Sequence, residues 1–97
     1  MLEKLKTVNV FAIERVMFIG EKRKECREIL SCWPTEYGAQ NELAKIMEDQ
    51  YGWNLLRYTI RSEADGGRVT VKENEDNGSY HVYTIKEVML LVKDTDS

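Results

Sequence analysis

WNLLRYTIRSEADGGRVTVKENEDNGSYHVYTI, residues 53–85, decides the fold because it contains three strand-like runs separated by two turn signals. The turn signals are Asp-Gly-Gly at 65–67 and Asp-Asn-Gly at 76–78. Asp-Gly and Asn-Gly supply the positive φ angles of short hairpin turns, and β-branched and aromatic residues fill the runs between them. The stretch therefore predicts an antiparallel three-stranded meander.

The first hairpin of this meander has a predicted register. A turn at 65–66 pairs Ile60 with Val71 and Ser62 with Val69. Side chains alternate along a strand, so one face is expected to pack on helices and the other to remain open. The packed face would carry Leu56, Tyr58, Ile60, Val69 and Val71, and the open face Arg57, Thr59, Arg61, Arg68, Thr70 and Lys72. In the second hairpin, the pattern leaves open whether Val82 or Tyr83 points inward.

The N-terminal third fits two templates. Apolar residues recur with heptad-like spacing, which favours a helix over residues 9–32. Residues 7–19 are also rich in β-branched residues and apolar on all sides, which suits a buried strand. The segment is therefore interpreted as helix or partly strand, with helix favoured.

A second helix is predicted over residues 36–51. Thr35 can cap it, Glu36 complements its dipole, and Gly52 stops it. After the meander, residues 86–92 form a near-continuous apolar run that permits a short C-terminal helix or a strand extension. The predicted fold class is α+β, with N-terminal helices packed on one face of a three-stranded antiparallel meander.

Length and composition indicate one globular domain over residues 1–97. The hydrophobic content of 42% and the charged content of 32% are those of an ordinary folded protein. No apolar run reaches membrane-spanning length, and the N-terminus lacks the layout of a signal peptide. We therefore expect a cytoplasmic protein with no membrane partner.

The residues that carry chemistry are sparse. Cys26 and Cys32 are the only cysteines and His81 is the only histidine, too few ligands for an ordinary zinc site. No nucleophile elbow, phosphate-cradling glycine loop or zinc-protease motif is present. The sequence thus predicts no catalytic residues, no metal site and no cofactor, and indicates a protein that is not an enzyme.

The open face of the meander is the predicted partner-binding surface. It would combine four cations with tyrosines from the third strand, namely Arg57, Arg61, Arg68, Lys72, Tyr80 and Tyr83. Guanidinium groups can contact carboxylates or phosphates, and a tyrosine can stack on a base. A charge of −3 argues against a dedicated nucleic-acid binder, because such proteins carry a larger positive bias.

Four aromatic residues, Trp33, Tyr37, Tyr51 and Trp53, flank the second helix and would become interface anchors if they remained exposed. The favoured interpretation is a small binding protein that acts by occupying a protein partner. Phage- and plasmid-encoded inhibitors and accessory factors often have this composition. The alternative is a nucleic-acid-binding domain that uses the basic sheet face, and a homodimer remains open.

Overall fold

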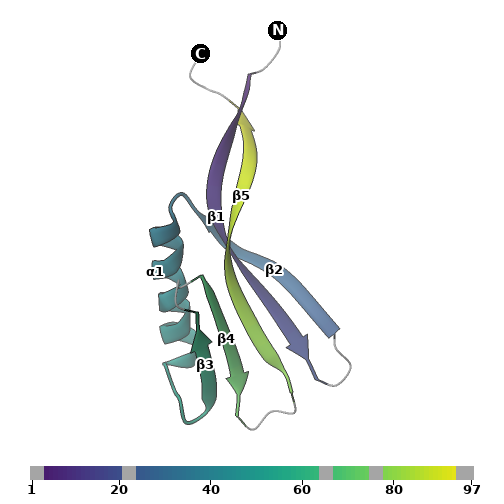
Figure 1. Cartoon of the computed structure of the whole chain (residues 1–97), viewed down its shortest axis with the longest axis vertical. Helices are drawn as coiled ribbons and strands as arrows, with labels where there is room; N and C mark the ends of the chain where they lie inside the picture. Colours follow the sequence, from purple (N-terminus) through teal and green to yellow (C-terminus); the bar gives the residue numbers. More distant parts are fainter. Residues whose placement is uncertain (1–3, 21–23, 64–66, 75–77, 94–97) are drawn as a thin grey trace.

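A computed structural model describes residues 4–20, 24–63, 67–74 and 78–93. Five antiparallel strands form one sheet in the order β2-β1-β5-β4-β3, with one helical segment against it (Figure 1). The strands are β1 (Leu5–Ile19), β2 (Lys24–Trp33), β3 (Tyr58–Ser62), β4 (Arg68–Glu73) and β5 (Tyr80–Lys93). The long strands β1 and β5 pair from Leu5–Lys93 to Phe18–Tyr80 and lie in the interior of the sheet.

The helix predicted over residues 36–51 is confirmed. It comprises α1 (Glu36–Ile46) and a π-helical turn, η1 (Met47–Tyr51). The Thr35 side chain accepts a hydrogen bond from the Gly38 N–H at 3.0 Å, as an N-cap does. Gly52 ends the helix in the left-handed conformation, at φ 55°. No helix in the described part of the chain has the length and apolar character needed to cross a bilayer.

The core lies between this helix and one face of the sheet. Ala39, Leu43 and Met47 supply the helical side of the core. The sheet contributes one or two residues from each of three strands, namely Ile13, Val69, Val71 and Tyr83. Burying these apolar side chains removes them from water and stabilises the packing of helix on sheet.

The helix favoured over residues 9–32 is wrong and the strand alternative is correct, because most of the described residues of this segment belong to β1 and β2. The spacing of apolar residues in this segment wrongly indicated a helix because β1 is apolar on both faces. Ile13 is buried under the helix, and Ala12 and Val16 are buried on the opposite face. Two-sided burial removes the alternation that identifies a strand. A bulge in β2, where the register shifts between Ile13 and Glu14, turns Leu30 toward the core.

The C-terminal segment is also a strand, since β5 continues without interruption to Lys93. The meander is therefore not a separate three-stranded sheet: its third strand pairs with β4 on one side and β1 on the other. The α+β arrangement of N-terminal helices on a meander is thus replaced by a five-stranded sheet with one helical segment.

The predicted register of the first hairpin is confirmed, with Ile60 opposite Val71 and Ser62 opposite Val69. The predicted packed face is largely correct, but Leu56 precedes β3 and is 94% exposed. In β5, Val82 and Tyr83 are both buried, Tyr83 in the core under the helix and Val82 on the opposite face between neighbouring strands. The predicted turn residues 65–66 and 76–77 lie outside the described residues.

Beyond the body of the fold, β1 and β5 continue together as a twisted two-stranded ribbon (Figure 1). In this ribbon, which we call the arm, Leu5–Val10 pairs with Val88–Lys93. The chain consequently extends 59 Å along its longest axis against 29 and 21 Å along the others. The two strands of the arm bond to each other, and the described residues supply no further strand on either side of them.

Candidate functional site

The structure brings together three of the six predicted partner-binding residues. Arg61, Lys72 and Tyr80 line a hollow of about 530 Å³ on the face of the sheet opposite the helix. Thr59, Thr70 and Gly78 complete its lining. Tyr80 stacks on Phe18, with ring centroids 4.5 Å apart, so its ring is fixed on this open face. Two cations, two hydroxyls and an aromatic ring thus surround one hollow.

The other three predicted residues lie elsewhere. Arg57 precedes β3, and its Nε lies 3.3 Å from Glu73 Oε1, which pairs its charge. Arg68 lies toward the other end of β4, where it lines a separate hollow with three glutamates, Glu36, Glu63 and Glu87. Tyr83 points into the core and is 0% exposed. Arg57 and Tyr83 therefore do not belong to the open basic face, whereas Arg68 shares that face with Thr70 and Lys72 along β4 but lies outside the hollow.

The open face carries both signs of charge. Glu14 accepts from Lys86 Nζ at 2.9 Å and lies 3.5 Å from Arg27 Nη1. Arg27 also pairs with Glu25 on its own strand. Because these cations are matched by carboxylates, this part of the face does not extend the positive surface of the Arg61–Lys72 hollow.

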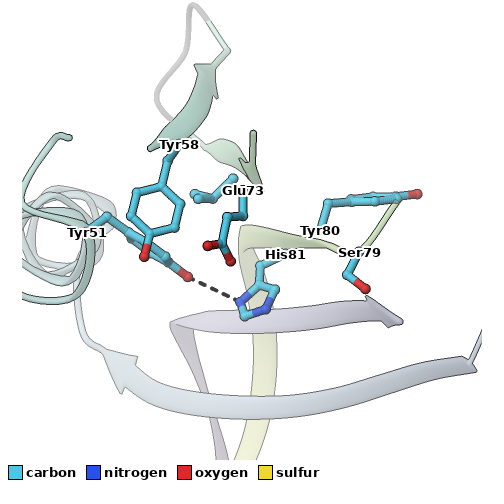
Figure 2. A pocket seen from close by; sticks show the side chains of 7 residues that line it. Tyr51, Tyr58, Glu73, Ser79, Tyr80 and His81 are labelled. Carbon is cyan, nitrogen blue, oxygen red and sulfur yellow. Dashed lines mark hydrogen bonds between the residues drawn. The ribbon is translucent and has the colours of Figure 1, made fainter. Parts of the chain in front are cut away.

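On the helix side of the sheet, a chain of hydrogen bonds joins η1 to β5. Tyr83 donates its single hydroxyl proton to Gln50 Oε1 at 3.3 Å, so its oxygen accepts from the Tyr51 hydroxyl at 2.6 Å. The Tyr51 oxygen in turn accepts from His81 Nδ1, at 3.2 Å (Figure 2). Each hydroxyl in this chain donates once and accepts once, which assigns a proton to His81 Nδ1.

A pocket of about 170 Å³ opens beside this chain and is lined by Tyr51, Tyr58, Glu73 and His81 among others. Figure 2 shows the tyrosine rings, the carboxylate and the imidazole around this common space. Burial, and the hydrogen bond to Tyr83, raise the pKa of Tyr51 above its usual value. Tyr51 therefore stays neutral and acts as a hydrogen-bonding group that holds the helix end on the sheet.

The loop between Gly52 and β3 exposes three large apolar side chains, Trp53, Leu55 and Leu56, which we call the apolar loop. The exposed fractions are 48%, 66% and 94% in that order. A leucine of a small domain is usually placed where packing removes it from water, so three such residues within four positions form an uncommon local concentration.

The backbone of the apolar loop is nevertheless ordered by hydrogen bonds. Asn54 Oδ1 accepts from the N–H groups of Leu56 at 3.2 Å and Arg57 at 3.3 Å. Just after β4, the Asn74 side-chain amide donates to the Leu56 carbonyl oxygen at 3.1 Å. Asparagine at the start of a turn commonly makes such local bonds. The apolar side chains are therefore displayed on a fixed frame.

Trp53 has a positive φ of 51°, which is uncommon outside glycine. Such a conformation costs of order 1–3 kcal/mol and persists only where the surroundings determine it. Here Gly52 is also left-handed, and the next residue, Asn54, bonds back to the Tyr51 carbonyl oxygen at 3.0 Å. Two successive left-handed residues thus form the turn that follows the helix.

The sequence contained a partial signal for this loop. Trp53 and Tyr37 belong to the aromatic residues expected to act as anchors if exposed, and both are exposed. Strand alternation predicts Leu56 on the packed face of the meander, but the regular strand begins only at Tyr58, two residues later. No periodicity applies in the turn, so Leu55 and Leu56 could not be placed from the pattern.

Cys26 and Cys32 are free thiols, both exposed, and each faces a different side of the sheet after the bulge in β2. Among the residues that the structure describes, no three of His, Cys, Asp or Glu gather as metal ligands would.

Comparisons with protein-family models, with curated proteins and with solved structures gave no match. The function is therefore argued from the residues themselves.

Proposed function

We propose that the protein is a non-catalytic binding module that occupies a protein partner through the apolar loop. The observation that carries this proposal is the display of Trp53, Leu55 and Leu56 in solvent by an ordered backbone. Tryptophan is enriched among residues that dominate binding energy at protein interfaces, and aliphatic neighbours exclude water around it.

The order of the loop supports binding for a thermodynamic reason. Association loses conformational freedom in side chains and loops, and a loop already held in one conformation loses less. The Asn54 and Asn74 hydrogen bonds fix the loop before any partner is met. Arg57, at the base of the loop, is held by Glu73 and lies over the Tyr58 ring at 5.2 Å.

The test compares the wild-type protein with the double variant Leu55→Ser/Leu56→Ser in capture from native cell extract, with and without nuclease. Tyr37→Ser is the matched control, because Tyr37 is an exposed aromatic residue at the other end of the helix. We expect a nuclease-resistant partner that binds wild type and Tyr37→Ser and is lost by the loop variant.

With the purified partner, the loop variant should raise Kd by about 30-fold, since truncating a dominant interface residue costs about 2 kcal/mol or more. Its unfolding free energy should change by no more than about 0.5 kcal/mol, because exposed residues contribute little to stability. Retention of full affinity by the folded loop variant would contradict the proposal.

A second candidate function is nucleic-acid binding at the hollow formed by Arg61, Lys72 and Tyr80. It predicts a nuclease-sensitive complex that is lost on Arg61→Glu/Lys72→Glu and not on the loop substitutions. Its affinity should fall with salt, with a log-log slope of about −0.9 for each phosphate contacted in duplex DNA. A salt-insensitive complex that survives this charge reversal would eliminate the second candidate.

A further inference from the structure

The arm exposes apolar side chains on both of its faces. Met89 and Leu91 are each 69% exposed on the face continuous with the helix side, and Leu5 is exposed on the same face. The opposite face carries a run of aliphatic residues from both strands, namely Val8, Val10, Val88, Leu90 and Val92. A two-stranded ribbon is marginally stable by itself in water, so a ribbon with two apolar faces calls for a further strand beside it.

Along the arm, no strand among the described residues pairs with the outer edge of β5. Ile85 donates its N–H to the Gly67 carbonyl oxygen at 2.8 Å, on the side of β4. Backbone groups alternate in direction along an antiparallel strand, so the odd-numbered residues from Glu87 to Lys93 point their N–H and C=O groups toward the same side. Along this part of β5, β1 is the strand partner found among the described residues.

We propose that the arm pairs with a second copy of this chain, through antiparallel β5–β5 contact about a two-fold axis at Leu90. Two-fold pairing of identical strand edges is self-complementary, because each residue i that meets j is matched by a j that meets i. The axis is perpendicular to the sheet, so the same face of both copies lies on the same side of the shared sheet. Two residues that pair must therefore point to the same face, which requires that the sum of their numbers is even.

The charged residues of β5 distinguish between the possible registers of the β5–β5 pair. A centre at Leu90 places Glu87 opposite Lys93 of the second copy, and pairs every residue between them with an aliphatic or methionine side chain. A centre at Met89 would set Lys93 against Ile85, and a centre at Leu91 would set Lys93 against Met89. The Leu90 register alone among these three joins opposite charges directly across the strands, which is the favourable arrangement.

The outer edge of β1 is a poorer match for itself. A centre at Thr7 sets Lys6 against Val8, and a centre at Val8 sets Lys6 against Val10. Both registers place an ammonium group against an aliphatic residue and give it no carboxylate partner. The β5 edge is therefore the edge that a second copy fits.

The backbone hydrogen bonds agree with the Leu90 register. In it, the four pairs formed by Glu87, Met89, Leu91 and Lys93 join residues whose backbone groups point toward each other, and each such pair exchanges two hydrogen bonds. The two bodies lie beyond opposite ends of a shared four-stranded ribbon, because the strands run in opposite directions. The arrangement is closed and stops at two copies.

A cysteine substitution at the axis tests the geometry. In a Cys26→Ser/Cys32→Ser background, Leu90→Cys should give a disulfide-linked dimer under mild oxidation, because opposite residues in a non-hydrogen-bonded pair have Cα atoms about 4.5 Å apart. Met89→Cys is the matched control, since residue 89 meets residue 91 of the other copy and its own counterpart lies about 8 Å away. Equal dimer yields from the two variants, or none from Leu90→Cys, would overturn the proposal.

Charge reversal tests the register in solution, by sedimentation from micromolar to millimolar concentration. Glu87→Lys or Lys93→Glu should each raise the dimer Kd by about tenfold, because like charges then oppose each other twice in the dimer. The double variant should restore the wild-type Kd, and an equimolar mixture of the two single variants should form heterodimers. Within one chain, the two residues lie about 20 Å apart, so this restoration would have to arise between copies.

A wild-type protein that remains monomeric at millimolar concentration would refute the proposal. A dimer whose Kd is the same for the wild type and for all three charge variants would form through another surface and would also refute the proposal. The Glu87 and Lys93 variants leave the apolar loop untouched, so this result is separate from the outcome of the capture experiment.

Discussion

Removing one hydroxyl from the core tests the hydrogen-bond chain between the helix end and the sheet. Tyr83 is fully buried, and its hydroxyl oxygen lies 2.6 Å from that of Tyr51 and 3.3 Å from Gln50 Oε1. Tyr83→Phe keeps the ring and removes both bonds. At a net contribution of about 1 kcal/mol for each hydrogen bond, we expect a loss of about 2 kcal/mol of unfolding free energy.

The shared bond makes this prediction sharper. Tyr51→Phe removes the bond to Tyr83 and the bond to His81, so it should also cost about 2 kcal/mol. The double variant removes three bonds instead of four, because the Tyr51–Tyr83 bond is common to both single variants. It should therefore cost about 3 kcal/mol, with a coupling energy of about 1 kcal/mol.

Urea unfolding followed by far-ultraviolet circular dichroism measures all four proteins of this cycle. The slope of unfolding free energy against urea should be unchanged, because the buried surface is nearly the same in each. Additivity of the two single costs within about 0.3 kcal/mol would show that the hydroxyls act independently, and would refute the reasoning.

Two further predictions concern the same helix. The raised pKa of Tyr51 keeps this side chain neutral in the folded protein, while in the unfolded chain it ionises near the ordinary tyrosine pKa of 10.0. Its contribution to stability is therefore complete below that pH and is lost as the pH rises toward the folded pKa. The stability difference between wild type and Tyr51→Phe should therefore shrink above this pH, and a difference that stays constant there would contradict the assigned shift. Separately, Thr35→Ala removes the acceptor of the Gly38 N–H and should cost about 1 kcal/mol, with Thr35→Ser as the control that retains the cap; equal stabilities in thermal unfolding would show that the cap contributes nothing.

The helix over residues 36–51 and the first hairpin were predictable from the sequence because their determinants are local. Thr35 caps the helix and Gly52 ends it, and each acts within one turn of the backbone. The register of Ile60 with Val71 follows from the length of the connection between two runs that alternate in polarity. These features need no knowledge of what lies on the other side of the core.

The N-terminal strands could not be separated from a helix in this way. β1 lies inside the sheet and buries residues on both faces, Ile13 under the helix and Ala12 and Val16 on the opposite face, so its apolar residues do not alternate. Its partners, β2 and β5, are set by the topology of the whole chain, and residue spacing within β1 does not contain that information. The same cause made the C-terminal run ambiguous.

The same distinction between local pattern and tertiary structure applies to the residues of the candidate binding surfaces. Strand alternation correctly placed Arg61 and Lys72 on one open face, because both lie inside regular strands. It failed for Arg57, which precedes β3, and for Tyr83, whose direction depended on the position of the helix.

The exposure of the apolar loop and of the arm was decided by the tertiary structure alone. Composition contains the leucines of both segments but does not say which of them the core can reach. The core of this small chain lies under a single helical segment, and β1 and β5 extend past its end. The physical reason is that burial is a property of contacts between distant segments, whereas turns and caps are properties of neighbouring residues.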